Sequence, residues 1–198
     1  WNARVTERNL FGVGHQISGN YKKKISSSDN AFSANYRINN IQKTYATFHL
    51  NYENEFNGDS SRSLDLSRPF FSPLTKNAGG IYYQNQLQTE SFILNDSIKT
   101  TPIKTAYQEY WYGRAFKVNN ENSYENKTRN LIAGITFNKL YYIQKPEANL
   151  DPYAFFSDEK NVIAHFGVSS QKYFKDNYIY YYDIVEDIPY GYNYAITL

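Results

Sequence analysis

The chain contains no cysteine and no methionine, and none of its 198 residues belongs to an apolar run long enough for a transmembrane helix. Without cysteine, disulfides and thiolate metal sites are excluded. Because a membrane-spanning helix needs roughly 18 or more consecutive apolar residues, any passage through a bilayer would have to use strands. Since there is no signal peptide at Trp1 and no methionine anywhere, we expect a processed product or an excerpt of a longer chain.

Concentrated charge of one sign is missing as well. The 21 Lys and Arg residues stand against 19 Asp and Glu residues, which gives a net charge of +2 at pH 7. The basic residues are scattered along the chain, so the sequence lacks the electrostatic footprint of a nucleic-acid-binding protein. We therefore expect no nucleic-acid partner.

Local catalytic motifs are also absent. The chain has three histidines, His15, His49 and His165, and the alternation of polar and apolar residues places each of them on a strand. No nucleophile elbow, zincin, phosphate-loop or zinc-ribbon spacing occurs. We therefore expect no enzyme, and no catalytic, cofactor-binding or metal site. A barrel hydrolase that uses His165 with Ser169 or Ser170 remains as an alternative.

Aromatic residues are abundant. The chain holds 21 Tyr, 13 Phe and 2 Trp, or 18% of its residues, although its mean hydropathy is only −0.69. Tyrosine combines an apolar ring with a polar hydroxyl, so it suits the two membrane–water boundaries of a transmembrane β-barrel. A soluble, Tyr-rich β-sandwich that binds carbohydrate could show the same composition and remains a second alternative.

A strict period of two residues in Thr44–Phe56 indicates a strand with two unlike faces. One parity is apolar and comprises Ala46, Phe48, Leu50, Tyr52 and Phe56. The other parity is polar and comprises Thr47, His49, Asn51, Glu53 and Glu55. Segments of this kind recur at about the 9–11 residues that a tilted strand needs to cross a bilayer. We predict that the first set faces lipid and the second faces the barrel interior.

Turn-forming clusters divide the chain into about ten predicted strands. These are Val13–Lys23, Ala31–Ile41, Lys43–Phe56, Ser61–Phe71, Ala78–Thr89, Ile103–Phe116, Thr128–Tyr142, Asn161–Phe174, Asn177–Ile188 and Tyr192–Leu198. The fold class predicted for residues 1–198 is all-β, a single antiparallel up-and-down transmembrane β-barrel or the first ten or so strands of a larger barrel. Short turns are expected near Gln42 and Asp176 on one rim, and long loops on the other at Phe92–Pro102, Val118–Lys127 and Gln144–Lys160.

Four short motifs resemble the BamA/TamA-like surface-antigen superfamily, in the form found in Bacteroidota. The run Asn9-Leu10-Phe11-Gly12-Val13-Gly14 resembles the N-L-x-G-x-G start of that family's first barrel strands. Asn35–Ile41 resembles its second strand. The strand end Arg68-Pro69-Phe70 resembles the family's R-P-F motif, and Glu186-Asp187-Ile188-Pro189-Tyr190-Gly191 resembles a segment of the Bacteroidota relatives.

The resemblance implies an outer-membrane protein that inserts or translocates other outer-membrane proteins. It implies outer-membrane lipid, nascent barrel clients and accessory lipoproteins as partners, and no cofactor. Two family features do not occur in these residues, the upstream periplasmic POTRA domains and a V-R-G-F/Y loop motif. We therefore expect the chain to be the N-terminal part of a barrel that is incomplete at its C-terminus.

The resemblance also implies a mobile seam, at which the first strand opens and offers its edge to an incoming strand. The sequence places this seam strand at Val13–Tyr21, where Gly12, Gly14 and Gly19 reduce side-chain packing. Glycines that merely relieve bends explain these positions equally well. A passive porin or solute channel would share the alternation and the aromatic residues, and it remains an alternative function.

Overall fold

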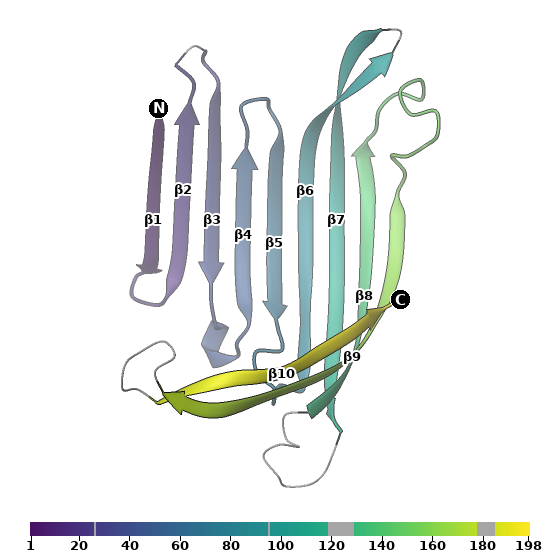
Figure 1. Ribbon diagram of the computed structural model, residues 1–198. Helices are drawn as coiled ribbons and strands as arrows, with labels where there is room; N and C mark the ends of the chain where they lie inside the picture. Colours follow the sequence, from purple (N-terminus) through teal and green to yellow (C-terminus); the bar gives the residue numbers. More distant parts are fainter. Residues whose placement is uncertain (26, 95, 119–128, 178–184) are drawn as a thin grey trace. The chain divides into compact units, whose positions relative to one another are not determined.

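The computed structural model describes residues 1–25, 27–94, 96–118, 129–177 and 185–198. Ten strands form one antiparallel sheet in which the strand order follows the chain from β1 to β10 (Figure 1). Their bounds are β1 Asn2–Leu10, β2 His15–Lys23, β3 Asn30–Ile38, β4 Thr47–Asn54, β5 Ser60–Arg68, β6 Asn77–Leu94, β7 Ser97–Lys117, β8 Arg129–Gln144, β9 Glu159–Asn177 and β10 Val185–Thr197. A short 3-10 turn, η1, covers Ile41–Lys43. The all-β, up-and-down prediction is therefore confirmed.

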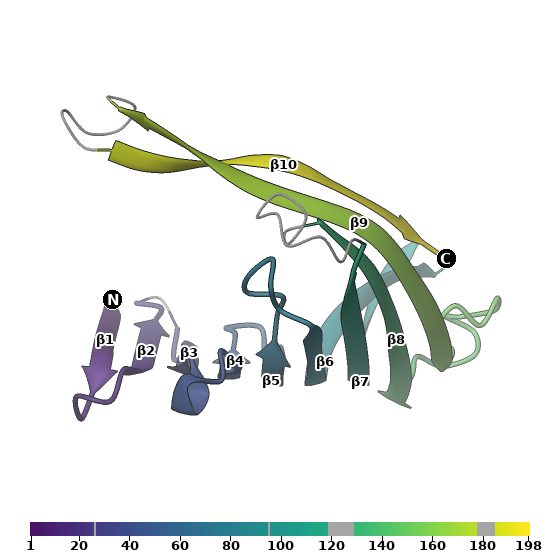
Figure 2. The same cartoon turned by 90° about the horizontal axis from the view of Figure 1, so that it is seen from below.

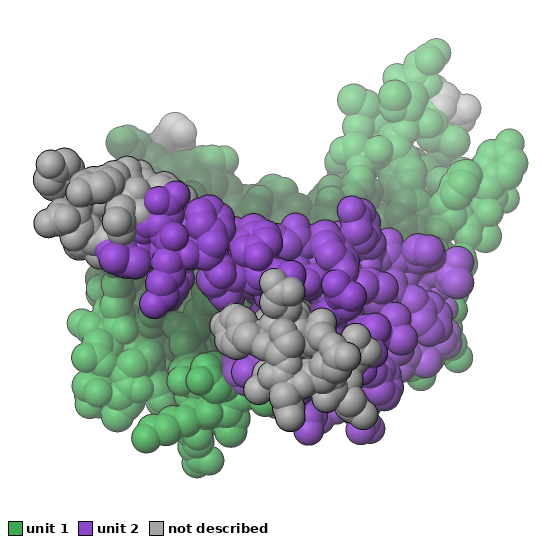
Figure 3. Space-filling view, turned by 60° about the horizontal axis from the view of Figure 1, so that its bottom comes forward, with its two compact units in different colours: residues 1–68, 80–110, 137–161 green, residues 69–79, 111–136, 162–198 purple. Residues whose placement is uncertain are grey.

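The described residues form two compact units (Figure 3). Unit 1 comprises Trp1–Arg68, Gly80–Tyr110 and Phe137–Asn161, and unit 2 comprises Pro69–Gly79, Trp111–Thr136 and Val162–Leu198. Strands β6, β7, β8 and β9 contribute to both units. No helix within the described ranges is long and apolar enough to cross a membrane.

The register of β1 to β5 gives unit 1 one polar and one apolar face. Residues that are paired across neighbouring strands share a face. His49 lies opposite Arg37 on β3 and Asp65 on β5, whereas Phe48 lies opposite Ile38 and Leu66. Phe48 and His49 therefore lie on opposite faces, as the alternation predicted. The same division into two faces holds along the paired residues of β3, β4 and β5. A slip of one residue in the register would move every side chain of a strand to the opposite face.

The apolar face of unit 1 is not covered by a hydrophobic core. Leu50 pairs with Tyr36 on one side and Leu64 on the other, yet its exposed fraction is 40%. Val5 is 72% exposed. Across the described residues, the only buried hydrophobic side chains are Ala78, Ile103 and Ala106. Large apolar residues on one face, with so little buried apolar material, are unusual for a water-soluble domain.

Strand β1 was not predicted from the sequence. Asn2–Leu10 carries Arg4, Glu7 and Arg8 and lacks a clear apolar parity, so the alternation rule passes over it. It nevertheless pairs with β2 in register, with Val5 opposite Gly19. The predicted seam strand Val13–Tyr21 therefore corresponds to β2, which has β1 on one side and β3 on the other. Its placement as the edge strand was wrong, because the edge belongs to the charged segment before it.

The predicted turn near Asp176 was wrong. The sequence Lys175-Asp176-Asn177 has turn chemistry, but these residues continue β9 and pair with Asp187, Glu186 and Val185 of β10. Strands β9 and β10 form one long hairpin (Figures 1 and 2). Part of the predicted strand Asn177–Ile188, residues 178–184, lies outside the described residues.

The predicted grouping of the long loops on one rim was also wrong. Most of Phe92–Pro102 is strand, since β6 ends at Leu94 and β7 begins at Ser97. This connection and the one after Lys117 leave opposite ends of β7, so they cannot share a rim. Most of the predicted loop Val118–Lys127, residues 119–127, lies outside the described residues.

Candidate functional site

The family-like motif Asn9–Gly14 forms the turn between β1 and β2. Phe11, Gly12 and Gly14 have positive φ angles of 56°, 74° and 75°, and such a conformation is far easier for glycine. The Gly12 amide donates to the Asn9 carbonyl at 2.9 Å, and the Gly14 amide donates to the Asn9 side-chain oxygen at 2.8 Å. Leu10 is the last residue of β1. The glycines are thus explained by the turn that fixes the β1–β2 hairpin.

The outer edge of β1 is the main candidate site. Trp1 and Lys23 exchange two backbone hydrogen bonds, at 2.8 and 2.9 Å, so they form a hydrogen-bonded pair of the ladder. Such pairs alternate along an antiparallel ladder. The backbone N–H and C=O groups of Asn2, Arg4 and Thr6 consequently point away from β2. Among the described strands, β1 has β2 as its single neighbour, so these groups are available to a further strand.

Packing along β1 is weak. Every residue from Asn2 to Asn9 is exposed. Val5 faces Gly19, and a β-carbon built on Gly19 would have no heavy atom within 4 Å. A cross-strand pair in which one member is glycine contributes little side-chain contact. The β1–β2 ladder is therefore held mainly by its backbone hydrogen bonds.

The other terminal strand, β10, has a different edge. Ala164 and Leu198 exchange two backbone hydrogen bonds, at 2.9 and 3.0 Å, so they form a hydrogen-bonded pair of the ladder. Because such pairs alternate, the backbone groups of Pro189 and Gly191 point away from β9. Pro189 has no N–H to offer at this edge. A β-carbon at Gly191 would overlap the Ser170 carbonyl oxygen, which explains glycine there. Glu186 and Asp187 lie opposite Asp176 and Lys175.

The R-P-F strand end is placed by specific contacts in each unit. In unit 1, the Arg68 Nε donates to the Thr44 carbonyl at 2.8 Å. In unit 2, the Phe70 ring lies so close to Gly113 that a β-carbon there would be 3.1 Å from two ring atoms. Pro69 accepts a hydrogen bond from the Phe71 amide at 2.9 Å. These contacts give the motif a structural role at the end of β5.

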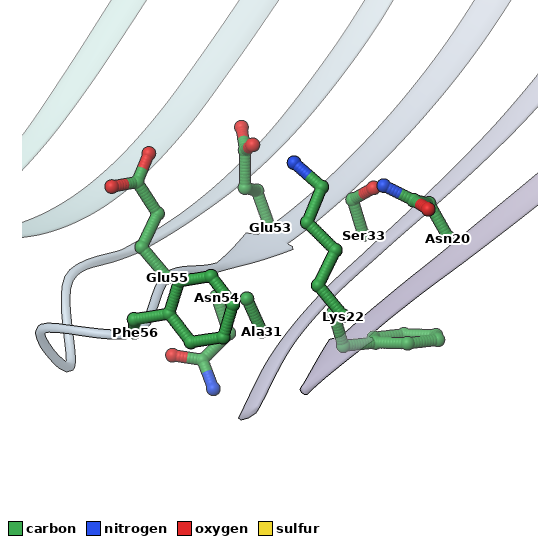
Figure 4. A pocket seen from close by; sticks show the side chains of 9 residues that line it. Asn20, Lys22, Ala31, Ser33, Glu53, Asn54, Glu55 and Phe56 are labelled. Atoms are coloured by element: carbon green, nitrogen blue, oxygen red, sulfur yellow. The ribbon is translucent and has the colours of Figure 1, made fainter. Parts of the chain in front are cut away.

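A small polar pocket lies on the polar face of unit 1, over β2 to β4 (Figure 4). Figure 4 shows the Lys22 side chain extending between Glu53 and the pair Ser33 and Asn20, with Glu55 next to Glu53. A row of this kind suits a water-filled interior. Within the described ranges, no group of three or more His, Asp or Glu side chains is placed to hold a metal ion.

Two of the three histidines, His15 and His165, lie within hydrogen-bond distance of hydroxyl groups. His165 lies in unit 2, where its ring nitrogens are 2.9 Å from the Thr136 hydroxyl and 3.3 Å from the Thr197 hydroxyl. Ser169 lies four residues further along β9. In unit 1, His15 Nδ1 is 2.7 Å from the Tyr36 hydroxyl. His165 is thus held by threonines, and in the described part of the chain no hydrogen bond joins it to Ser169 or Ser170.

The connection between β8 and β9 belongs to unit 1 and folds back onto β6 and β8. Asp158 Oδ1 accepts a hydrogen bond from the Tyr142 amide at 3.0 Å and lies 3.3 Å from the Lys145 ammonium. The Tyr142 amide, and then Lys145, lower the pKa of Asp158 below its ordinary value. The Phe156 ring contacts Tyr142 and Phe92 at centroid distances of 5.7 and 5.8 Å. These contacts hold the end of the predicted long loop, next to β9, against β8 and β6.

Comparison with protein-family models, curated proteins and solved structures found no match to this chain.

Proposed function

We propose that this chain is part of the wall of a β-barrel in a bacterial outer membrane. The observation that carries the proposal is the exposed apolar face of β1 to β5, opposite a face of Asn, Ser, Glu and Lys side chains. Lipid would cover the first face and water the second. Strand β4 has eight residues and every other strand has nine or more, close to the roughly 9–11 residues that a tilted strand needs to cross a bilayer.

Within that membrane, we propose a role in inserting or translocating other outer-membrane proteins. The edge of β1 supports this role, because it offers backbone groups at Asn2, Arg4 and Thr6 and packs weakly through Gly19. An extended client segment would add to it as a new strand, with main-chain hydrogen bonds that do not depend on the client sequence. The Asn9–Gly14 resemblance points to the same function. Nascent outer-membrane proteins are the proposed clients, and accessory lipoproteins are proposed partners.

The test replaces Thr6 by proline in the full-length protein. The Thr6 N–H points away from β2, so Thr6→Pro leaves the β1–β2 hydrogen bonds in place and removes one donor from the free edge. We expect client insertion into proteoliposomes to slow several-fold. Thr6→Ala keeps the N–H and is the matched control. Normal insertion by a folded Thr6→Pro variant would contradict the proposed role.

A passive porin or solute channel is the second candidate, and the polar pocket around Lys22 and Glu53 favours it. A porin conducts ions steadily in planar bilayers and has no need of the β1 edge. Thr6→Pro would therefore leave its conductance unchanged. Client insertion and conductance measured on the same variants separate the two functions.

A further inference from the structure

A shallow groove runs across the apolar face of unit 1, over β2 to β6. Its volume is about 470 Å³, and its lining is predominantly apolar. The residues that form its apolar floor are Ile17, Tyr36, Leu50, Tyr52, Leu64 and Tyr83. Acyl chains are the part of a membrane that such a surface accommodates.

One end of the groove is cationic. Arg62 lines the groove, and its guanidinium carbon lies 5.4 Å from the centre of the Tyr52 ring. Asn85 also lines it and donates to the Tyr83 hydroxyl at 2.8 Å. Arg62 and Asn85 continue into a second hollow of about 370 Å³, where they are joined by Lys104 and Gln144. An apolar groove and a cationic hollow thus share two side chains.

No carboxylate lines either hollow. Neither Arg62 nor Lys104 has a carboxylate partner among the described residues. Both cations are exposed. Arginine and lysine have long apolar stems, which can lie along apolar surface while the charge stays in water. Arg62 is paired with Tyr52 and so lies on the apolar face, near the start of β5. If lipid covers that face, a headgroup layer would meet the strands near one of their ends.

We propose that this surface binds an anionic phospholipid. The phosphate lies between Arg62 and Lys104, where a guanidinium offers paired donors and an ammonium offers a point charge. Asn85 and Gln144 supply neutral polar contacts, and an acyl chain follows the groove from Tyr52 toward Ile17. This inference rests on the proposed membrane location, because lipid must reach the apolar face.

The test uses the full-length protein in a non-ionic detergent and counts bound lipid by native mass spectrometry. Dioleoylphosphatidylglycerol and dioleoylphosphatidylcholine are the anionic and zwitterionic probes. We expect phosphatidylglycerol to bind more tightly than phosphatidylcholine. Arg62→Gln with Lys104→Gln should weaken its binding roughly 25-fold, at about fivefold for each lost charge. The matched control is Lys43→Gln with Lys99→Gln, which removes two exposed positive charges outside both hollows and should leave binding unchanged.

Equal binding of the two lipids, or equal loss in the two double variants, would overturn the proposal. Inorganic phosphate at millimolar concentration should not displace phosphatidylglycerol, since it cannot use the groove; displacement would overturn the assignment of the acyl chain. Incorporation into phosphatidylcholine nanodiscs is measured separately. Failure to enter that bilayer contradicts the proposed function, whereas entry without any preference for phosphatidylglycerol contradicts only the lipid site.

Discussion

A charge placed on each face of β4 in turn tests the membrane orientation most directly. Leu50 and Asn51 are neighbours in the chain but lie on opposite faces, Leu50 between Tyr36 and Leu64 and Asn51 between Asn35 and Ser63. Leu50→Arg and Asn51→Arg introduce the same side chain, one position apart. The pair therefore separates the effect of the face from the effect of the substitution itself.

The expected magnitudes depend on what covers the apolar face. If lipid covers it, Leu50→Arg costs about 2–4 kcal/mol of the free energy of unfolding near mid-depth. If water covers it, the loss is limited to the buried part of Leu50, which is 40% exposed, or about 1 kcal/mol. Asn51→Arg, on the polar face, should stay within roughly 0.5 kcal/mol of the parent protein in both cases.

The assay is urea unfolding of the full-length protein in phospholipid vesicles, followed by the fluorescence of its tryptophans. The transition midpoint of Leu50→Arg should fall well below that of Asn51→Arg, at unchanged slope. Equal midpoints for the two variants would refute the assignment of the Leu50 face to lipid. A larger loss in Asn51→Arg would reverse the orientation of the wall.

Two further predictions concern local structure. Gly191→Ala should destabilise the β9–β10 hairpin by about 1–3 kcal/mol, because the new β-carbon meets the Ser170 carbonyl. Gly19 has open space around it, so Gly19→Ala should not lower stability. Urea unfolding compares the two variants. Because the pKa of Asp158 is lowered in the folded protein, its carboxylate contributes to stability above the ordinary pKa of 3.8. This contribution to stability is lost as the pH falls through the folded-state pKa. NMR titration of the Asp158 carboxyl should give a pKa below 3.8. Asp158→Asn should abolish the extra loss of stability below pH 3.8. An unshifted titration would contradict the hydrogen bond from the Tyr142 amide.

The sequence alone determined the class of fold and the two-faced strands. The alternation around Phe48 and His49 predicted which residues share a face, because the period of a strand is a local property of the backbone. The glycines at Gly12 and Gly14 likewise indicated a bend, since positive φ is a preference of the single residue. In each of these cases the physical cause lies within a few residues of the position.

Only the tertiary structure decided which strand forms the edge and where charges lie on the apolar face. Asn2–Leu10 is a strand because β2 supplies its hydrogen-bond partners, although its own residues carry no apolar parity. Lys175-Asp176-Asn177 has the composition of a turn, yet its pairing with Val185–Asp187 keeps it in β9. Arg62 and Lys104 line one hollow only because β5 and β7 both pair with β6. Pairing partners are non-local, so edges and shared surfaces follow from the register and not from any single segment.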